Sequence, residues 1–207
     1  MLVTDVIDVE NILYVEKRLG LPDGFIEALS SESDWGYIVK SHALYESLFS
    51  SLLCVAFDNS NLEKSLLKLP MNGKCSKVSF LSSLDLISTD HKDKIFPFIN
   101  SLSQIRNYIV HDASNLNFNI QDYFDNLKPS DRKKLSKSLL FYSKGLTNKI
   151  SQVDCETDKG KWDLILYSNV RLWFEITNQV VFQIVSLYVQ VEELQVEKHN
   201  FEREKLA

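Results

Sequence analysis

Residues Asp90 to His111 read DHKDKIFPFINSLSQIRNYIVH, and this stretch decides how the chain is expected to fold. Its apolar side chains recur every three or four residues, which is the repeat of a helix with one buried face. These side chains are Ile95, Phe98, Ile99, Leu102, Ile105, Tyr108 and Ile109. Pro97 lies inside the repeat, so either a separate first turn precedes a main helix that Pro97 opens, or one helix is kinked there.

The same repeat predicts helices on both sides of this stretch. The expected ranges are 6–19, 25–29, 35–57, 62–69, 76–87, 129–149 and 161–199, and the range 113–122, rich in Asn and Ser, is expected to be a loop. The β-branched run 180–185 is compatible with a strand, but its flanks have a helical period, which favours a helix. Only 6 Gly and 4 Pro occur in 207 residues, and this scarcity favours long helices over an all-β fold.

These ranges predict an all-α protein. We expect an N-terminal helical segment over 1–30, a helical bundle over 31–150 and a long C-terminal helix over 161–207 that packs on the bundle. The polar range 151–160 is the expected connection. Residues 192–207 are strongly charged, so the end of the last helix is expected to fray or project.

Charge, cysteines and hydropathy narrow the functional classes. The net charge of −5 argues against a protein that coats nucleic acid without regard to sequence. Cys54, Cys75 and Cys155 form no CxxC pair, so we expect reduced thiols rather than a zinc site or a disulfide, with Cys54 in the core. The N-terminus carries acids where a signal peptide carries basic residues, and no uncharged apolar run reaches about 18 residues. A soluble, cytoplasmic protein without a membrane partner is expected.

Arg106, Asn107 and His111 form a candidate catalytic group at the end of the quoted stretch. On a helix, Asn107 and His111 share a face, and the long side chain of Arg106 can turn toward the same place. Arg offers a planar fork of donors for phosphate oxygens, His titrates near neutral pH, and Asn can orient the His. This group suits RNA cleavage without a metal, in which the ribose 2′-hydroxyl attacks the adjacent phosphorus. One His cannot be acid and base in the same instant, so a homodimer is expected to supply the second.

The hexapeptide Arg-Asn-Tyr-Ile-Val-His at 106–111 resembles the Arg-x(4–6)-His signature of HEPN domains. The range 40–48, KSHALYESL, resembles the early core helix of the HEPN proteins related to the mannitol-operon-repressor (MltR) family. Together the resemblance covers roughly residues 34–115. It implies a helical bundle that dimerises through the motif helices and, in many members, a metal-independent ribonuclease that serves as a toxin or an antiphage effector. Members close to MltR are regulators or binding proteins instead.

Several other residues have both a functional and a plain structural interpretation. Glu46, His42 and Asp112 are candidates for a second layer of residues around the motif, while a packed His42 with a salt bridge is the simpler interpretation. Basic residues that could guide RNA phosphates follow at Lys133, Lys134 and Lys137. A solvated helix face is the favoured interpretation of these lysines, and a helix C-terminus with basic residues that complement the helix dipole would explain the motif itself.

Two functions stay open. The first is an endoribonuclease of HEPN type in a bacterial toxin–antitoxin or antiphage defence system, with His111 as acid or base, Arg106 as phosphate clamp and Asn107 orienting the His. The second is a non-catalytic, MltR-like regulatory module whose long C-terminal helix docks a partner protein. A third, weaker hypothesis is that the chain neutralises or regulates an effector protein encoded nearby. The expected partners are RNA, a second copy and an antitoxin or regulatory protein, and neither a cofactor nor a metal is expected.

Overall fold

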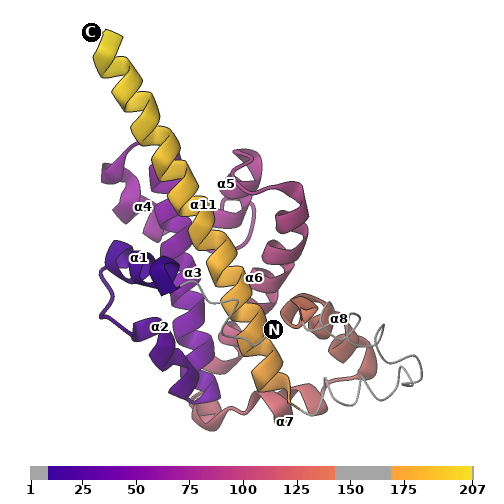
Figure 1. Cartoon of the computed structure of the whole chain (residues 1–207). Coiled ribbons are helices and arrows are strands. Elements are labelled where there is room, and N and C mark those ends of the chain that lie inside the picture. Colours follow the sequence, from indigo (N-terminus) through magenta and orange to yellow (C-terminus); the bar gives the residue numbers. More distant parts are fainter. Residues whose placement is uncertain (1–8, 143–168, 207) are drawn as a thin grey trace, which may run out of the picture.

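The computed structural model describes residues 9–142 and 169–206, and in these residues it contains helices and no strand. The prediction of an all-α bundle with a long C-terminal helix is confirmed (Figure 1). The α-helices are α1 (Val9–Leu19), α2 (Phe25–Ala28), α3 (Asp34–Ala56), α4 (Glu63–Leu67), α5 (Lys77–Ser83), α6 (Thr89–Val110), α7 (Ile120–Asp125), α8 (Pro129–Leu139) and α11 (Val170–Leu206). Short 3₁₀ turns occupy Leu29–Ser31, Ser60–Leu62 and Ala113–Asn117.

Helix α3 forms the centre of the bundle, and its sequence explains why. Ser33 caps its N-terminus, where the Ser33 hydroxyl oxygen accepts a hydrogen bond from the backbone N–H of Gly36 at 3.2 Å. Apolar side chains cover most of its circumference, so α3 packs on α11, α6, α4 and α5 at once. The expected range 35–57 agrees with α3 to within one residue at each end.

Helix α11 lies along α3, and a buried polar network joins the two helices (Figure 1). The amide nitrogen of Asn178 on α11 donates to the hydroxyls of Tyr37 at 2.8 Å and Ser41 at 3.2 Å. The hydroxyl of Tyr45 donates to the backbone carbonyl of Asn178 at 2.8 Å and to its side-chain oxygen at 3.0 Å. The ring of Phe174 meets the ring of Tyr37 edge to face, with centroids 5.4 Å apart. These contacts fix the register of α11 on the bundle.

Helix α6 carries the quoted stretch as one continuous helix from Thr89, with Pro97 inside it. The predicted alternative of a separate first turn before Pro97 is therefore wrong. The expected apolar side chains are buried with one exception: Tyr108 is 54% exposed, so its place in the buried stripe is also wrong. Six outward residues recur instead at intervals of four and three, and all are exposed: Asp93, Pro97, Asn100, Gln104, Asn107 and His111. This outward stripe runs the length of α6.

Three expected boundaries are corrected. The range 113–122 is not a loop, because Asp112 and Asn119 cap a 3₁₀ turn and α7 with their side chains. The helix expected over 76–87 ends at Ser83, and Asp85 takes a left-handed φ of 57° that a helix cannot continue through. The helix expected over 129–149 is interrupted, because α8 ends at Leu139 and Leu140 leaves helical geometry; residues 141 and 142 are helical again, and residues 143–149 lie outside the described part of the chain.

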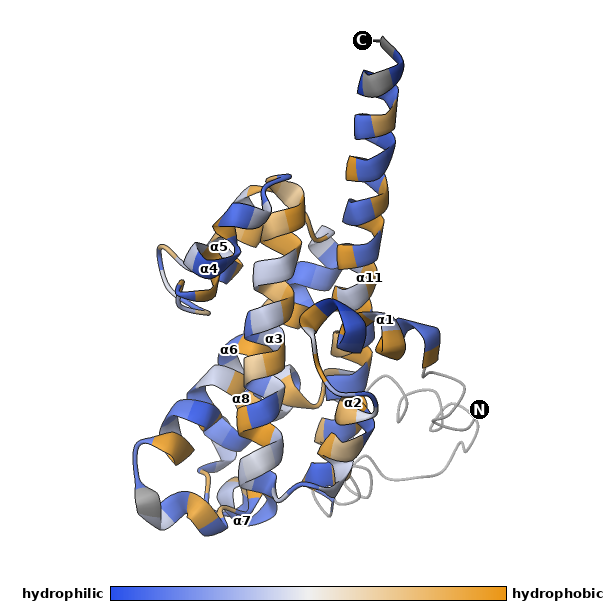
Figure 2. Ribbon diagram, turned by 90° about the vertical axis from the view of Figure 1, so that its left-hand side faces the viewer, coloured by the Kyte–Doolittle hydropathy of each residue, from blue (hydrophilic) through white to orange (hydrophobic). Residues whose placement is uncertain are grey.

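Helix α11 continues to Leu206, past the expected end at 199, and its last turns extend beyond the bundle (Figures 1 and 2). The charged end is thus helical and projects. Arg203 and Lys205 lie in its last turn, where positive charge complements the helix dipole. No helix of the described residues is both long enough and apolar enough to cross a membrane.

Some expectations fall on residues that are not described. These are the N-terminal range 1–8, the connection 151–160, the first part of the helix expected from 161, and Cys155. Of the other two cysteines, Cys54 is buried as expected and Cys75 is exposed.

Candidate functional site

The structure brings the side chains of Arg106 and Asn107 together near the C-terminal end of α6. The Nη1 group of Arg106 donates a hydrogen bond to Oδ1 of Asn107 at 3.1 Å. Arg106 is half-buried, while Asn107 is exposed. The long arginine side chain thus turns sideways along the helix, and the donor group Nδ2 of Asn107 can serve another acceptor.

His111 closes α6 as its C-terminal cap, with φ −87° and ψ −7°, and its side chain is exposed. It lies one helical turn after Asn107 on the outward stripe. The imidazole is therefore available to solvent and lies outside the hydrophobic core. The backbone end of α6 is held by Trp35 on α3, whose ring N–H donates to the carbonyl of Ile109 at 3.4 Å.

An aromatic cluster that the sequence did not predict lies beside the motif. The ring of Tyr108 on α6 stands 5.3 Å from the ring of Tyr123 and 6.4 Å from that of Phe118, measured between centroids. Phe118 and Tyr123 are 5.6 Å apart. The side-chain amide of Asn115 donates to the carbonyl of Tyr108 at 3.1 Å and ties the following turn to α6. The range 113–122 was expected to be a loop, so no local pattern placed these rings together.

His42 on α3 is buried and is held by Ser103 on α6. Its Nε2 atom lies 2.9 Å from the Ser103 hydroxyl oxygen, and that hydroxyl donates its own proton to the carbonyl of Ile99 at 2.8 Å. Ser103 also accepts from Asn72 at 2.8 Å. Because the Ser103 proton is already used, Nε2 of His42 must be the donor. The other ring nitrogen, Nδ1, lies 3.8 Å from the Glu46 carboxylate.

Burial lowers the pKa of His42 below its ordinary value of 6.5. The Glu46 carboxylate opposes this shift, whereas the positive charges of Arg106 and Lys77 add to it. His42 is therefore neutral at pH 7, and the charge of Arg106 reaches the His42–Glu46 pair. Glu46 is half-exposed and lies next to His42 on the same face of α3.

Asp112 and the three lysines occupy simpler positions. The Asp112 carboxylate accepts from the backbone N–H of Ser114 at 2.8 Å, and this hydrogen bond lowers the pKa of Asp112. Its role as a cap accounts for its position directly after His111. Lys133, Lys134 and Lys137 are exposed on α8, which packs against α6.

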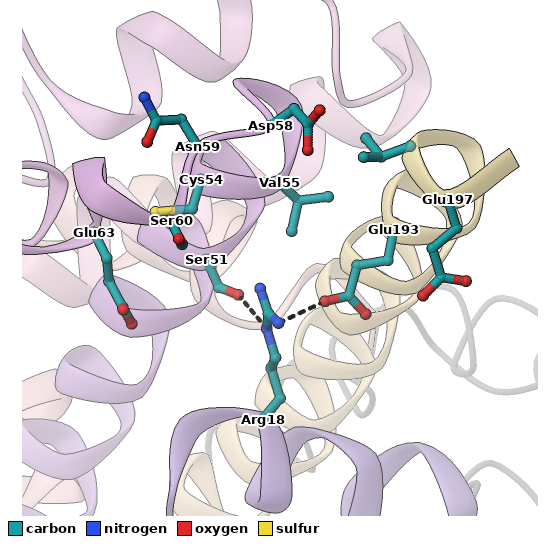
Figure 3. A pocket seen from close by; sticks show the side chains of 11 residues that line it. Arg18, Ser51, Cys54, Val55, Asp58, Asn59, Ser60, Glu63, Glu193 and Glu197 are labelled. Carbon is teal, nitrogen blue, oxygen red and sulfur yellow. Dashed lines mark hydrogen bonds and ion pairs between the residues drawn. The ribbon is translucent and has the colours of Figure 1, made fainter. Parts of the chain in front are cut away.

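Two cavities of the described part of the chain lie away from this motif. The first has a volume of about 470 Å³, and Arg18 enters it between carboxylates, bonded to Ser51 at 3.0 Å and to Glu193 at 2.8 Å (Figure 3). The second, of about 400 Å³, lies between α1, α2, α3 and α11. Neither of these two cavities is lined by Arg106, Asn107 or His111. Among the described residues, no group of three His, Cys, Asp or Glu side chains is arranged to hold a metal ion.

Fold and site together define an all-α helical bundle in which a half-buried Arg106 and the exposed Asn107 and His111 lie at the C-terminal end of α6. Comparison with protein-family models, with curated proteins and with solved structures finds no match to this chain.

Proposed function

We propose that this chain is a metal-independent endoribonuclease of HEPN type that acts in the cytoplasm, in a bacterial toxin–antitoxin or antiphage system. The observation that carries the proposal is the arrangement at the end of α6. Asn107 and His111 face solvent one turn apart, and the guanidinium of Arg106 is bonded to Asn107. These side chains offer one proton-transfer group and a positive charge for the phosphoryl oxygens, and they stand where a large substrate can reach them.

Each side chain has a separate task in this proposal. His111 accepts the proton of the ribose 2′-hydroxyl, or gives a proton to the leaving 5′-oxygen. Arg106 stabilises the charge that develops on the phosphoryl oxygens as the 2′-oxygen attacks the phosphorus. Asn107 accepts from Arg106 through Oδ1, so its Nδ2 group can donate to a phosphoryl oxygen or orient His111.

The outward stripe of α6 supports a shared site between two copies. Its six residues are exposed and lie on one face of α6, so this face is open to a second copy of the helix. Asn107 and His111 close this stripe at one end. Two such helices crossing at that end would supply two imidazoles, one as base and one as acid.

The aromatic cluster and α8 give this site a means to hold RNA. Tyr108 is exposed beside the motif and makes ring contacts with Phe118 and Tyr123, so it offers a supported face on which a base can stack. The exposed lysines of α8 add positive charge on the helix that packs against α6. An acidic protein can thus bind RNA through a local patch.

The first experiment compares wild type with His111→Ala on a mixed set of RNAs, with and without EDTA. We expect wild type to cleave in both conditions. His111→Ala should cleave about 10²- to 10⁴-fold more slowly, because an acid–base group is lost, while its circular dichroism stays helical. His199→Ala removes an exposed imidazole on α11 and is the matched control. If wild type leaves all RNAs intact with EDTA and without it, the nuclease proposal fails.

A second candidate function, an MltR-like regulatory module, is favoured by the projecting part of α11. Figure 2 shows apolar residues continuing along this part of the helix. Exposed apolar side chains recur along the second half of α11, from the part beside the bundle into the projecting end, at intervals of four, three and seven: Leu187, Val191, Leu194 and Phe201. They form one stripe of a kind that packs against a partner helix. Glu197 and Glu202 lie exposed beside it, so a partner helix with basic flanks would match it.

Induced expression in bacteria separates the two functions. A nuclease should arrest growth as wild type and not as His111→Ala. A regulatory module should leave growth and RNA unchanged in both, whereas Leu194→Glu should abolish recovery of one specific partner protein because it places a charge in the apolar stripe.

A further inference from the structure

The cavity between α1, α2, α3 and α11 has the size and lining of a small-molecule site. Its volume is about 400 Å³, within the usual range for ligand pockets. The apolar part of its wall comes from all four elements: Ile12, Leu13, Ile26, Leu29, Leu44 and Phe182. Such a wall accepts an apolar chain, since contact with these side chains removes the chain from water.

Glu16 supplies a buried carboxylate to this mostly apolar space. It lines the cavity and is only 1% exposed. Its two carboxylate oxygens accept hydrogen bonds from the backbone N–H groups of Gly24 at 2.9 Å and Ile26 at 2.8 Å. These bonds fix the direction of the carboxylate and cap the start of α2, and each oxygen keeps a second lone pair.

Among the described residues that line this space, none is Lys, Arg or His, so none of them places a positive charge opposite Glu16. The two other lining carboxylates differ from Glu16: Glu175 is bonded to Arg171, and Glu27 is exposed to water. The two backbone N–H groups compensate part of the cost of burying this charge, and the ammonium group of a bound molecule can add the ion pair that the described lining lacks.

We infer that this cavity binds an amphipathic amine, with its ammonium group at Glu16 and its apolar chain along the wall formed by α1, α2 and Phe182. An alkyl carboxylate of the same length would bring a second negative charge to Glu16 and is excluded by repulsion. A neutral alcohol would gain the apolar contacts without the ion pair. The amine site contains no residue of the α6 motif, so amine binding can be tested independently of the nuclease proposal.

The test is isothermal titration calorimetry of the full chain with n-decylamine, n-decanol and n-decanoate, each below its micelle concentration. We expect saturable binding of decylamine with a Kd roughly tenfold or more below that of decanol, because only the amine pairs with Glu16. Decanoate should show no saturable binding. Equal Kd values for the amine and the alcohol, or no binding of the amine, would overturn the inference.

Two variants locate the site. Glu16→Gln removes the charge, so the Kd for decylamine should rise to that for decanol. Because Glu16 also caps α2, Leu13→Trp provides a second variant: Leu13 is 51% exposed at the edge of the cavity, where a bulky ring can fill the space without disturbing the core. It should abolish binding of both compounds. Leu172→Trp replaces an exposed leucine of α11 outside the cavity and should bind as wild type does. If Leu13→Trp still binds decylamine, the ligand lies elsewhere and the inference is wrong.

Discussion

At the residue scale, His42 shows how burial decides the charge of a side chain. Its Nε2 atom donates to Ser103, and its Nδ1 atom lies near the Glu46 carboxylate. The buried environment nevertheless lowers its pKa, and Arg106 and Lys77 add to the effect. Protonation of His42 would place a positive charge between α3 and α6, where the packing of the two helices excludes water. The folded structure therefore favours the neutral form of the His42 ring.

A pH dependence of stability follows from this shift. The unfolded chain binds a proton at His42 near pH 6.5, whereas the folded chain binds it only at lower pH. Between the pKa of His42 in the folded chain and its pKa in the unfolded chain, the unfolded state holds more protons, so the free energy of unfolding falls as the pH falls. The contribution of the neutral His42 to the free energy of unfolding is fully present above pH 6.5 and is lost progressively below it. Urea unfolding at several pH values between 7.5 and about 5 measures this slope.

The matched variant for this prediction is His42→Gln, which keeps a donor for Ser103 and does not titrate. Its free energy of unfolding should fall less steeply with acid than that of wild type over the same pH range. His199→Gln, at an exposed position of α11, should retain the slope of wild type. Equal slopes for wild type and His42→Gln would contradict the assignment of the proton-linked loss to His42.

At the element scale, the contact between α3 and α11 combines apolar packing with one polar centre. Asn178 makes hydrogen bonds to Tyr37, Ser41 and Tyr45, and all four residues are buried. The apolar side chains around them would tolerate several registers of one helix along the other. The hydrogen bonds form in only one register, because each donor and acceptor must meet its partner away from water.

Asn178→Leu tests this role, since leucine has nearly the same size and cannot form the hydrogen bonds. The hydroxyls of Tyr37 and Ser41 would then be buried without the amide, while Tyr45 keeps its hydrogen bond to the backbone carbonyl of residue 178, and we expect the free energy of unfolding to fall by about 3 kcal/mol. Urea unfolding followed by circular dichroism measures the loss. Gln179→Leu, at a half-buried position next to it, should change stability by less than about 1 kcal/mol. Similar losses in both variants would show that the network contributes little.

At the scale of the whole molecule, the motif of one chain holds a single histidine from α6 at an exposed surface. The core lies on the other side of this helix, formed with α3 and α8. The catalytic proposal needs a second proton-transfer group across the cleaved bond, and a second copy of α6 is the element that would provide it.

Mixing of chains tests the shared site. Adding a ninefold excess of His111→Ala to a fixed amount of wild type, followed by time for exchange, should lower the rate of RNA cleavage to about a tenth, because nearly all wild-type chains would then be paired with an inactive copy. RNA is kept saturating so that the variant does not deplete the substrate. An unchanged rate would mean that each chain cleaves by itself and that the paired arrangement is wrong.

The sequence by itself determined the helices that have a strong local repeat. Helices α3 and α6 lie within a residue or so of their expected ranges, and the place of Asn107 and His111 on one face of α6 was predicted from helical spacing. Such features depend on residues three or four apart, which a local pattern records. The short elements after His111 were missed, because Asn and Asp both cap helices and form loops.

Only the tertiary structure decided which distant residues meet. It placed Tyr108 among the rings of Phe118 and Tyr123, joined His42 to Ser103, and closed a cavity around Glu16 from four separate helices. Helical spacing says which face of a helix a residue occupies and nothing about the helix that faces it. That choice belongs to the packing of the whole bundle, because it is the sum of all buried contacts that selects one arrangement.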